Sequence, residues 1–362
     1  MTGVTTLDSA TPADPSPGLG SLPAPLARLG ARHPLVIAAI IVTIAVTVVA
    51  TISTVAGFLA PHWWVFDIVT SYRPQEAIAL AVAVVMALIL RCWKILPIAV
   101  LALALNVWQV APVYREHQPA RTVGSDTLSI AHLNLQSSKG DIPAMKAWLA
   151  DHPADIVVIL DTQRDLAVAV YQGVGDYSMV YPAVAGFTTN KKSKTTSVTF
   201  APRSAEVVVL TDIQGVTAAK PTTSDLPTSA VEIHTAIGDQ DVTLLGLHTE
   251  SPTTSERHRT RDVQLDAVGS WIDATPAPAI AFGDFNVTYY SPVFRDLLGR
   301  TGARSSQLGF GIQATWPVQF RPAGIGIDQS IYSGGLTAVT RRRGPSLGSE
   351  HRVLIVTYAL SG

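Results

Sequence analysis

Cysteine is nearly absent from this chain of 362 residues, because Cys92 is the only one. A disulfide within the chain is therefore impossible, and a structural zinc site with several cysteine ligands is excluded. A chain of this length has room for one large domain or two smaller ones, whose cores do not depend on such cross-links.

Charge is also scarce: Asp, Glu, Lys and Arg together make up 15% of the residues, and the net charge is −1. This balance gives no argument for a polyanionic partner of the whole chain. Acidic residues slightly outnumber basic ones in residues 126–362, so a nucleic-acid-binding role would require the basic residues to gather on one face.

The basic residues of this region include three short clusters, at 191–194, at Arg257, Arg259 and Arg261, and at 341–343. We interpret them as solvated loops and the start of one helix. For the cluster at 341–343, the alternative is a role on a substrate phosphate or an anionic headgroup.

Apolar sequence is abundant, with hydrophobic residues at 48% and a mean hydropathy of +0.30. Most of it lies within residues 35–113. Residues 1–32 are rich in Thr, Ser, Pro, Gly and Ala without periodicity, which is typical of a disordered tail. A secretory signal is the alternative, but the apolar region starts too late and is too long for one.

Three apolar stretches follow the tail, at 34–60, 77–90 and 95–113. The first exceeds the roughly 20 residues that a helix needs to cross the hydrocarbon core of a bilayer. Aromatic residues near the ends of these stretches fit the belts of a membrane interface. We therefore predict a membrane domain at 33–114 with about three transmembrane helices. A buried hairpin of a soluble protein is the alternative.

Basic residues near the ends of these stretches predict the orientation. Arg28 and Arg32 precede the first stretch. Arg91 and Lys94 join the second to the third, whereas the loop between the first two contains only Arg73. The positive-inside rule then places the N-terminus in the cytoplasm. With three spans, the rest of this multi-pass cell-membrane protein is extracytoplasmic.

A polar linker is expected at 115–125 and a globular domain at 126–362. Short β-rich runs alternate with helical periodicity in this domain. Asp141 is the expected N-cap of one helix, and Ser255 opens a longer one. Helices on the outside of two packed sheets, an α/β sandwich, would account for the alternation.

The stretch at 281–287 places two side chains with oxygen ligands two residues apart, after an apolar run. Asp284 and Asn286 would share one face of an extended segment. Gly283 would let another backbone or a ligand come close. A solvated turn is the alternative, because Asp, Asn and Gly are ordinary turn residues.

Other polar residues lie at the ends of further expected strands. They are Asn134, Asp161, His248, Asp328 and the adjacent pair Glu350 and His351. Taken singly, each histidine would more often be an ordinary half-buried residue, and each aspartate a cap or turn residue. Their occurrence together, each at the end of a strand, is the specific signal.

In their order along the chain, these residues resemble the endonuclease/exonuclease/phosphatase superfamily, which has a deoxyribonuclease-like fold of two packed sheets. The resemblance covers roughly residues 126–360. It implies hydrolysis of a phosphoester with Mg²⁺ or Mn²⁺, cations that prefer oxygen ligands. It also implies that Asn134, Asp161 and Glu350 hold the metal.

The same resemblance implies the catalytic roles. Asp284 would position or deprotonate the attacking water, and Asn286 would donate to the phosphate. His248 and His351 would face the phosphate, with Asp328 fixing the ring of His351.

Three positions depart from the usual family pattern. Asp161 stands where the family most often has glutamate, and Glu350 where it has aspartate. Gln136 stands where nucleases of the group often have a second acid. Both exchanged residues are still carboxylates.

The sequence therefore predicts a membrane-anchored, extracytoplasmic, metal-dependent phosphodiesterase or phosphatase. Its partners would be the lipid bilayer and a phosphoester, such as a phospholipid or a lipid-linked cell-envelope intermediate. A surface endonuclease or exonuclease is one alternative, with nucleic acid as the less favoured substrate. A non-catalytic binding module with a degenerate metal site is the other.

Overall fold

In the computed structural model, the described residues are 33–115, 126–136, 140–162, 167, 169–170, 177–182, 184–190, 195–200, 206–276 and 278–361. The expected tail at 1–32, all but the first residue of the expected linker at 115–125, and the basic cluster at 191–194 lie outside them.

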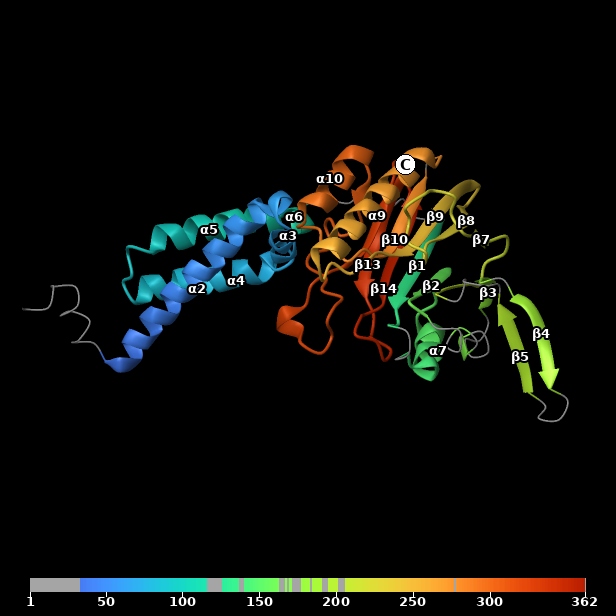
Figure 1. Cartoon of the computed structure of the whole chain (residues 1–362), viewed down its shortest axis with the longest axis horizontal. Coiled ribbons are helices and arrows are strands. Elements are labelled where there is room, and N and C mark those ends of the chain that lie inside the picture. Colours follow the sequence, from blue (N-terminus) through green and yellow to red (C-terminus); the bar gives the residue numbers. More distant parts are fainter. Residues whose placement is uncertain are drawn as a thin grey trace, which may run out of the picture.

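Apolar helices form the N-terminal part of the described chain (Figure 1). Its elements are α2 (Pro34–Phe58), the short η1 (Ala60–His62), α3 (Trp64–Thr70), α4 (Arg73–Ile89), α5 (Leu96–Val110) and α6 (Pro112–Arg115). Proline occupies the first turn of α2, α4 and α5, where no hydrogen bond within the helix requires its missing N–H. Large apolar side chains such as Ile41, Val49 and Ile52 face outward from α2, as expected for contact with lipid.

These helices differ in length. α2, with 25 residues, is long and apolar enough to cross a membrane. α3 and α4 reach that length only if they count as one span, and they meet at an angle of 67°. α5 has only 15 residues. Among the residues that the structure describes, one helix is long and apolar enough to cross a membrane, or two if the bent pair counts as one span. The predicted number of three stays a prediction.

A cluster of buried polar residues links α2, α4 and α5 by hydrogen bonds. The Arg73 guanidinium lies 3.3 Å from the Glu76 carboxylate and donates to the Asn106 side chain at 3.2 Å and to the Thr54 carbonyl at 3.1 Å. Because a buried charge is tolerated only when it is paired and hydrogen-bonded, these contacts fix how α2, α4 and α5 pack.

The α/β domain contains two six-stranded sheets and a separate two-stranded ribbon (Figure 1). The first sheet has the order β13-β14-β1-β2-β6-β3, the second has the order β11-β12-β10-β9-β8-β7, and β4 pairs with β5. The strands are β1 (Thr127–Asn134), β2 (Ile156–Leu160), β3 (Ser178–Tyr181), β4 (Val184–Asn190), β5 (Thr195–Phe200), β6 (Val207–Thr211), β7 (Thr217–Ala219), β8 (Val231–Ile237), β9 (Gln240–His248), β10 (Ala279–Asp284), β11 (Arg304–Ser305), β12 (Asp328–Tyr332), β13 (Leu336–Arg343) and β14 (Leu354–Leu360).

The main hydrophobic core lies between the two sheets. Ile130 and Val158 enter it from β1 and β2, and Leu244 and Phe282 enter it from β9 and β10. All four side chains are buried, and burial of each contributes roughly 1.5 to 3 kcal/mol of transfer free energy. The packing of the two sheets therefore rests on alternate, inward-facing residues of their central strands.

Helices cover the outer faces of both sheets. α7 (Ile142–Asp151) begins after its predicted N-cap Asp141, whose side chain accepts the N–H of Ala144 at 3.0 Å. α9 (Ser255–Ala274) and α10 (Pro292–Thr301) pack on the second sheet. The predicted α/β sandwich with helices outside is confirmed.

Strand pairing brings polar residues to one edge of the sandwich. β9 and β10 are parallel, and His248 and Asp284 are level with each other at their carboxyl ends. β12 pairs with β10 in the antiparallel sense and places Asp328 opposite Asp284. β1 is parallel to β2, so Asn134 ends its strand next to the residues that follow β2.

The helical segment, which comprises α2 to α6 (residues 34–115), contacts the α/β domain directly (Figure 1). Asp67 of α3 lies 2.7 Å from the guanidinium of Arg261 in α9. The Gln75 side chain of α4 donates to the Gly324 carbonyl at 2.7 Å. The end of the helical segment is therefore docked beside the edge that carries the polar residues.

Candidate active site

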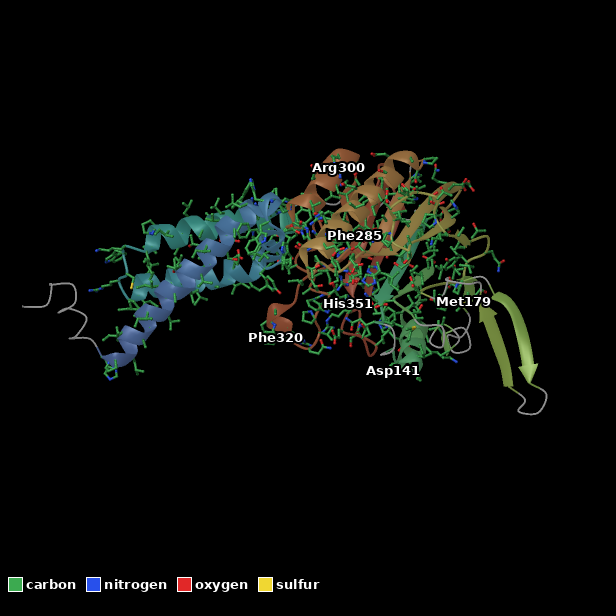
Figure 2. The ribbon with its side chains drawn as sticks, in the orientation of Figure 1. Asp141, Met179, Phe285, Arg300, Phe320 and His351 are labelled. Carbon is green, nitrogen blue, oxygen red and sulfur yellow. The ribbon has the colours of Figure 1, made fainter. Side chains whose placement is uncertain are left out.

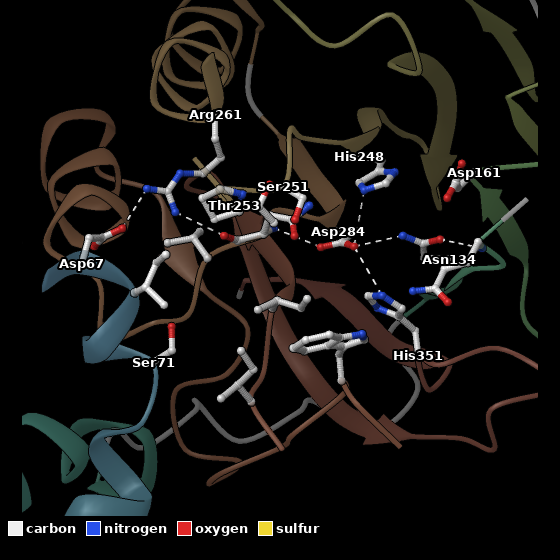
Figure 3. A pocket seen from close by; sticks show the side chains of 18 of the residues that line it. Asp67, Ser71, Asn134, Asp161, His248, Ser251, Thr253, Arg261, Asp284 and His351 are labelled. Atoms are coloured by element: carbon white, nitrogen blue, oxygen red, sulfur yellow. Dashed lines mark hydrogen bonds and ion pairs between the residues drawn. The ribbon is translucent and has the colours of Figure 1, made fainter. Parts of the chain in front are cut away.

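Asp284, the last residue of β10, lies at the centre of the candidate active site (Figure 3). Gly283 before it has φ of 139°, and a Cβ at this position would lie 1.9 Å from the carbonyl oxygen of Leu247. Only glycine permits β10 to approach β9 this closely. The predicted close approach at Gly283 is confirmed, and it sets Asp284 beside the end of β9.

The buried carboxylate of Asp284 is surrounded by donors. Its Oδ2 accepts a hydrogen bond from Asn134 Nδ2 at 2.9 Å and lies 3.6 Å from His248 Nε2 and 3.7 Å from His351 Nε2. Its Oδ1 accepts the backbone N–H of Asn286 at 3.0 Å. Figure 3 shows these side chains converging on Asp284. Such a network fixes the orientation of the carboxylate.

His351 is held by a second buried carboxylate, that of Asp328. Its Nδ1 donates to Asp328 Oδ2 at 3.0 Å, and Asp328 Oδ1 lies 3.4 Å from His132 Nε2. Burial opposes the charge of the imidazolium, but the carboxylates of Asp328 and Asp284 raise the pKa of His351 to about 9. Burial also opposes ionisation of Asp328, yet His351 and His132 keep the pKa of Asp328 below its usual value. These two carboxylates therefore favour the protonated form of the His351 imidazole.

Asn286 lines the same cavity as Asp284, although not by the expected strand geometry. Its φ of 47° ends the extended conformation after β10. The side-chain Nδ2 donates to the Thr249 carbonyl at 2.8 Å. An amide nitrogen carries two N–H groups, so the role of Asn286 as a donor to phosphate stays a prediction.

Asn134 and Asp161 lie on the side of the cavity opposite α3 (Figure 3). Asn134 Oδ1 accepts the backbone N–H of Gln136 at 2.9 Å, and Gln136 Nε2 lies 3.4 Å from Glu350 Oε2. A carbonyl oxygen has two lone pairs, so this hydrogen bond leaves Asn134 able to ligate. Amide and carboxylate oxygens are the donors that Mg²⁺ and Mn²⁺ prefer. The chemical types of the three predicted ligands therefore suit a hard divalent cation, but Glu350 is not among the residues that line the cavity, and their role as metal ligands stays a prediction.

Asp284, Asp328 and His351 could also share a metal ion, since one ligand atom from each lies within 4.8 Å of the others. We regard this trio as the poorer metal site. Nδ1 of His351 already donates to Asp328, whose other carboxylate oxygen faces His132, so two of the three residues already engage each other. The oxygen donors at Asn134 and Asp161 are the better candidates.

A cavity of about 540 Å³ adjoins these residues. Polar side chains from the strand ends form one side of it. The other side is largely apolar and combines residues of the helical segment with residues of the α/β domain: Trp64, Ile68, Tyr72, Val287, Trp316, Ile325 and Ile327. The helical segment is thus part of the candidate active site, which nothing in the sequence had indicated.

A buried ion pair lies beside this apolar side. Arg261 is only 1% exposed, so the interpretation of its cluster as a solvated helix start is wrong for this residue. Its guanidinium lies 2.7 Å from Asp67 Oδ2 and donates to the Asn286 carbonyl at 3.2 Å. Arg261 can be buried because a tertiary contact pairs it with a carboxylate from α3, and the local sequence does not show this contact. Through Arg261, α3 contacts the turn that carries Asn286.

The sequence did not predict that His132 and Arg341 lie beside Asp328. His132 lies two residues before Asn134 in β1, and this spacing on one face of a strand could have indicated it. Arg341 is 4% exposed and donates to the Asp328 carbonyl at 3.1 Å, so its interpretation as solvated is also wrong. An irregularity in the register of β13 between Ala338 and Thr340 shifts the alternation that would have predicted its burial.

A family model supports the same fold, and three solved structures are reported as similar to this chain. The family model described as "Endonuclease/Exonuclease/phosphatase family" matches residues 131–351. A humanized D. rerio TDP2 with 14 mutations is 15% identical, with a TM-score of 0.49 over 64% of this chain and 98% of that chain. The endonuclease domain of TRAS1, a telomere-specific non-LTR retrotransposon, is 13% identical, with a TM-score of 0.45 over 65% of this chain and 100% of that domain. An endonuclease/exonuclease/phosphatase from Beutenbergia cavernae is 14% identical, with a TM-score of 0.45 over 66% of this chain and 72% of that chain. No curated protein matches the chain.

Proposed function

Because the chain belongs to the endonuclease/exonuclease/phosphatase family, we propose that it is a metal-dependent phosphoester hydrolase whose active site is the cavity around Asp284. The observation that carries this proposal is the environment of one carboxylate oxygen. Asp284 Oδ2 is approached by Asn134 at the end of β1, by His248 at the end of β9 and by His351 in the loop before β14. A buried acceptor with donors arranged around it is what activation of a water beside a phosphate requires.

In this proposal each residue has a separate task. A divalent cation held by Asn134, Asp161 and Glu350 would neutralise charge on the phosphate oxygens. Asp284 orients the attacking water and accepts its proton. The imidazolium of His351 donates Nε2–H to a phosphate oxygen as negative charge develops there.

The remaining predicted residues support these groups. Asp328 fixes the ring of His351 through Nδ1, which leaves Nε2–H on the side of Asp284. His248 lies at the end of the neighbouring strand, with its Nε2 also near Asp284. Asn286 supplies its backbone N–H to Asp284 and its side-chain amide to the phosphate.

We further propose that the substrate is a phosphoester in or near the bilayer, such as a phospholipid or a lipid-linked cell-envelope intermediate. The support is the apolar side of the cavity, where Trp64, Ile68 and Tyr72 come from the helical segment. With its phosphate at Asp284, a substrate would place an apolar group against these side chains. Burial of that group would contribute roughly 25 cal/mol for each Å² removed from water.

The test of catalysis uses the full chain in detergent. We expect it to hydrolyse a plain phosphodiester or phosphomonoester with Mg²⁺ or Mn²⁺, to lose activity in a metal chelator, and to regain it when either cation is restored. DNA and phospholipid are compared in the same assay. Activity that survives chelation would contradict the metal-dependent mechanism. Absence of hydrolysis of all four substrates, with metal binding intact, would favour the binding-module alternative.

The proposal also places the α/β domain outside the cytoplasm. A fluorescent reporter that matures only in the cytoplasm should stay dark when fused after Gly362. The matched control is the same reporter fused before Met1, which should fluoresce. Bright fluorescence from the C-terminal fusion would show that the number or the orientation of the spans is wrong.

A further inference from the structure

A second cavity, of about 290 Å³, lies behind the loop that carries Trp316. Its lining consists of Ala314, Pro317, Val318, Arg321, Gly324, Arg343 and Arg352. Trp316 itself lines the candidate active site, where its ring centre lies 6.5 Å from that of His351. Because the two cavities share no lining residue, the second cavity is separate from the candidate active site.

Three arginine side chains, Arg321, Arg343 and Arg352, line this cavity. Burial, followed by the neighbouring charges of Arg352 and Arg321, lowers the pKa of Arg343. Arg343 donates to the Ala314 carbonyl at 2.8 Å, and Arg352 donates to the Gly344 carbonyl at 3.5 Å. Among the residues that the structure describes, no carboxylate lines the cavity. Three cations that line one cavity, two of them hydrogen-bonded to backbone carbonyls, form a site that an anion would stabilise.

Glu350, the acidic residue nearest in sequence to these arginines, does not line the second cavity. Glu350 lies two residues before Arg352, but its Oε2 is 3.4 Å from the Gln136 side chain, on the active-site side. Its backbone carbonyl accepts the N–H of Val318. Through this hydrogen bond the backbone of Glu350 holds Val318, one of the residues that line the second cavity.

The position of the cavity indicates the source of the anion. Arg321 opens the short helix η2 (Arg321–Ala323), and the Gly324 carbonyl after it accepts the hydrogen bond from Gln75 in α4. Phe320 is 62% exposed. Figures 1 and 2 show that the loop with Phe320 projects from the α/β domain on the side from which the apolar helices extend. A bilayer around those helices would meet this loop at its surface.

We propose that Arg321, Arg343 and Arg352 form a second anion site, which binds the phosphate of an anionic phospholipid headgroup while Phe320 enters the adjacent apolar region. Guanidinium groups suit phosphate because they donate paired hydrogen bonds. An exposed aromatic side chain next to cations matches the surface of an anionic bilayer. The site requires the α/β domain to lie beside a membrane, as the proposed function does, but it does not require catalysis.

The test is native mass spectrometry of the full chain in detergent, with phosphatidylglycerol and phosphatidylcholine as the two lipids. We expect the chain to retain phosphatidylglycerol at least about tenfold more tightly, because only this lipid has an uncompensated phosphate charge. Arg321→Gln should reduce the preference several-fold. Arg321 lies in an exposed loop, so the fold should persist, and thermal unfolding checks this.

Two further variants sharpen the test. Replacing Arg321, Arg343 and Arg352 together by Gln should abolish the preference. Arg342→Gln is the matched control, because Arg342 is an exposed neighbour in β13 that does not line the cavity, and the preference should be unchanged.

Several outcomes would overturn the assignment. Equal retention of both lipids by the unmodified chain, or an unchanged preference in Arg321→Gln, would remove the site. Displacement of phosphatidylglycerol by an equal concentration of inorganic phosphate would point to a site for free anions. Tighter binding of a single-stranded oligonucleotide would point to nucleic acid. Hydrolysis of a soluble phosphodiester should be the same in Arg321→Gln as in the unmodified chain, so failure of this site and failure of the catalytic proposal are distinguishable.

Discussion

Asp284→Asn is expected to lower the turnover of a soluble phosphodiester by at least about a hundredfold, the scale that a general base contributes. The change keeps the size of the side chain but removes the charge that accepts a proton. It also replaces one carboxylate oxygen with an amide nitrogen that cannot accept from Asn134 or Asn286. The measurement is the initial rate with saturating Mg²⁺ or Mn²⁺.

His351→Gln is expected to cause a loss of similar size, because the imidazolium that stabilises developing charge disappears. Glutamine is the informative replacement, since its amide can still donate to Asp328. Alanine would leave the Asp328 carboxylate buried without this partner, which costs about 3 to 5 kcal/mol of stability. A loss of fold would then be confused with a loss of chemistry.

His234→Gln is the matched control for both variants. His234 lies in β8 of the same sheet and is exposed, away from the cavity. Its rate should stay within about twofold of the unmodified chain, since surface substitutions away from a site have small effects. Full activity in a folded Asp284→Asn or His351→Gln variant would contradict the assignment of the site.

The strand-end residues could be predicted from the sequence because strand pairing decides where they meet. Once β9 and β10 are parallel, His248 and Asp284 must lie side by side, and β12 then sets Asp328 opposite Asp284. Next to Asp284, the alternation rule failed beyond the end of β10, at Asn286, where φ is positive. Asn286 nevertheless lines the same cavity as Asp284, because the turn after β10 returns it to the same edge.

The contribution of the helical segment could not be predicted in this way. α3 has only seven residues, too few to show an amphipathic period, and the sequence indicates no partner for Asp67. The Asp67–Arg261 contact joins positions 194 residues apart. Only the docking of α3 on α9 explains why a residue within a basic helix start is buried, and why the N-terminal helical segment borders the cavity.

Asp67→Asn is therefore expected to lower the free energy of unfolding by about 3 to 5 kcal/mol, the range seen when one partner of a buried pair is removed. The Arg261 guanidinium would stay buried without the carboxylate 2.7 Å away. Hydrolysis should fall as well, at temperatures where the variant is folded, because Arg261 also holds the Asn286 carbonyl. Urea unfolding of the full chain in detergent and the rate on a soluble phosphodiester are the measurements.

Asp262→Asn tests whether burial of the Asp67–Arg261 pair is the reason for the large expected loss of stability. Asp262 lies at the same 2.7 Å from the Arg261 guanidinium, but its side chain is 31% exposed, against 7% for Asp67. Solvent screens an exposed pair, so this variant should lose only about 0 to 1 kcal/mol and keep its activity. Equal losses of stability in the two variants would show that burial does not set the strength of these pairs. A folded Asp67→Asn variant with full activity would show that the docking of α3 does not position the turn at Asn286.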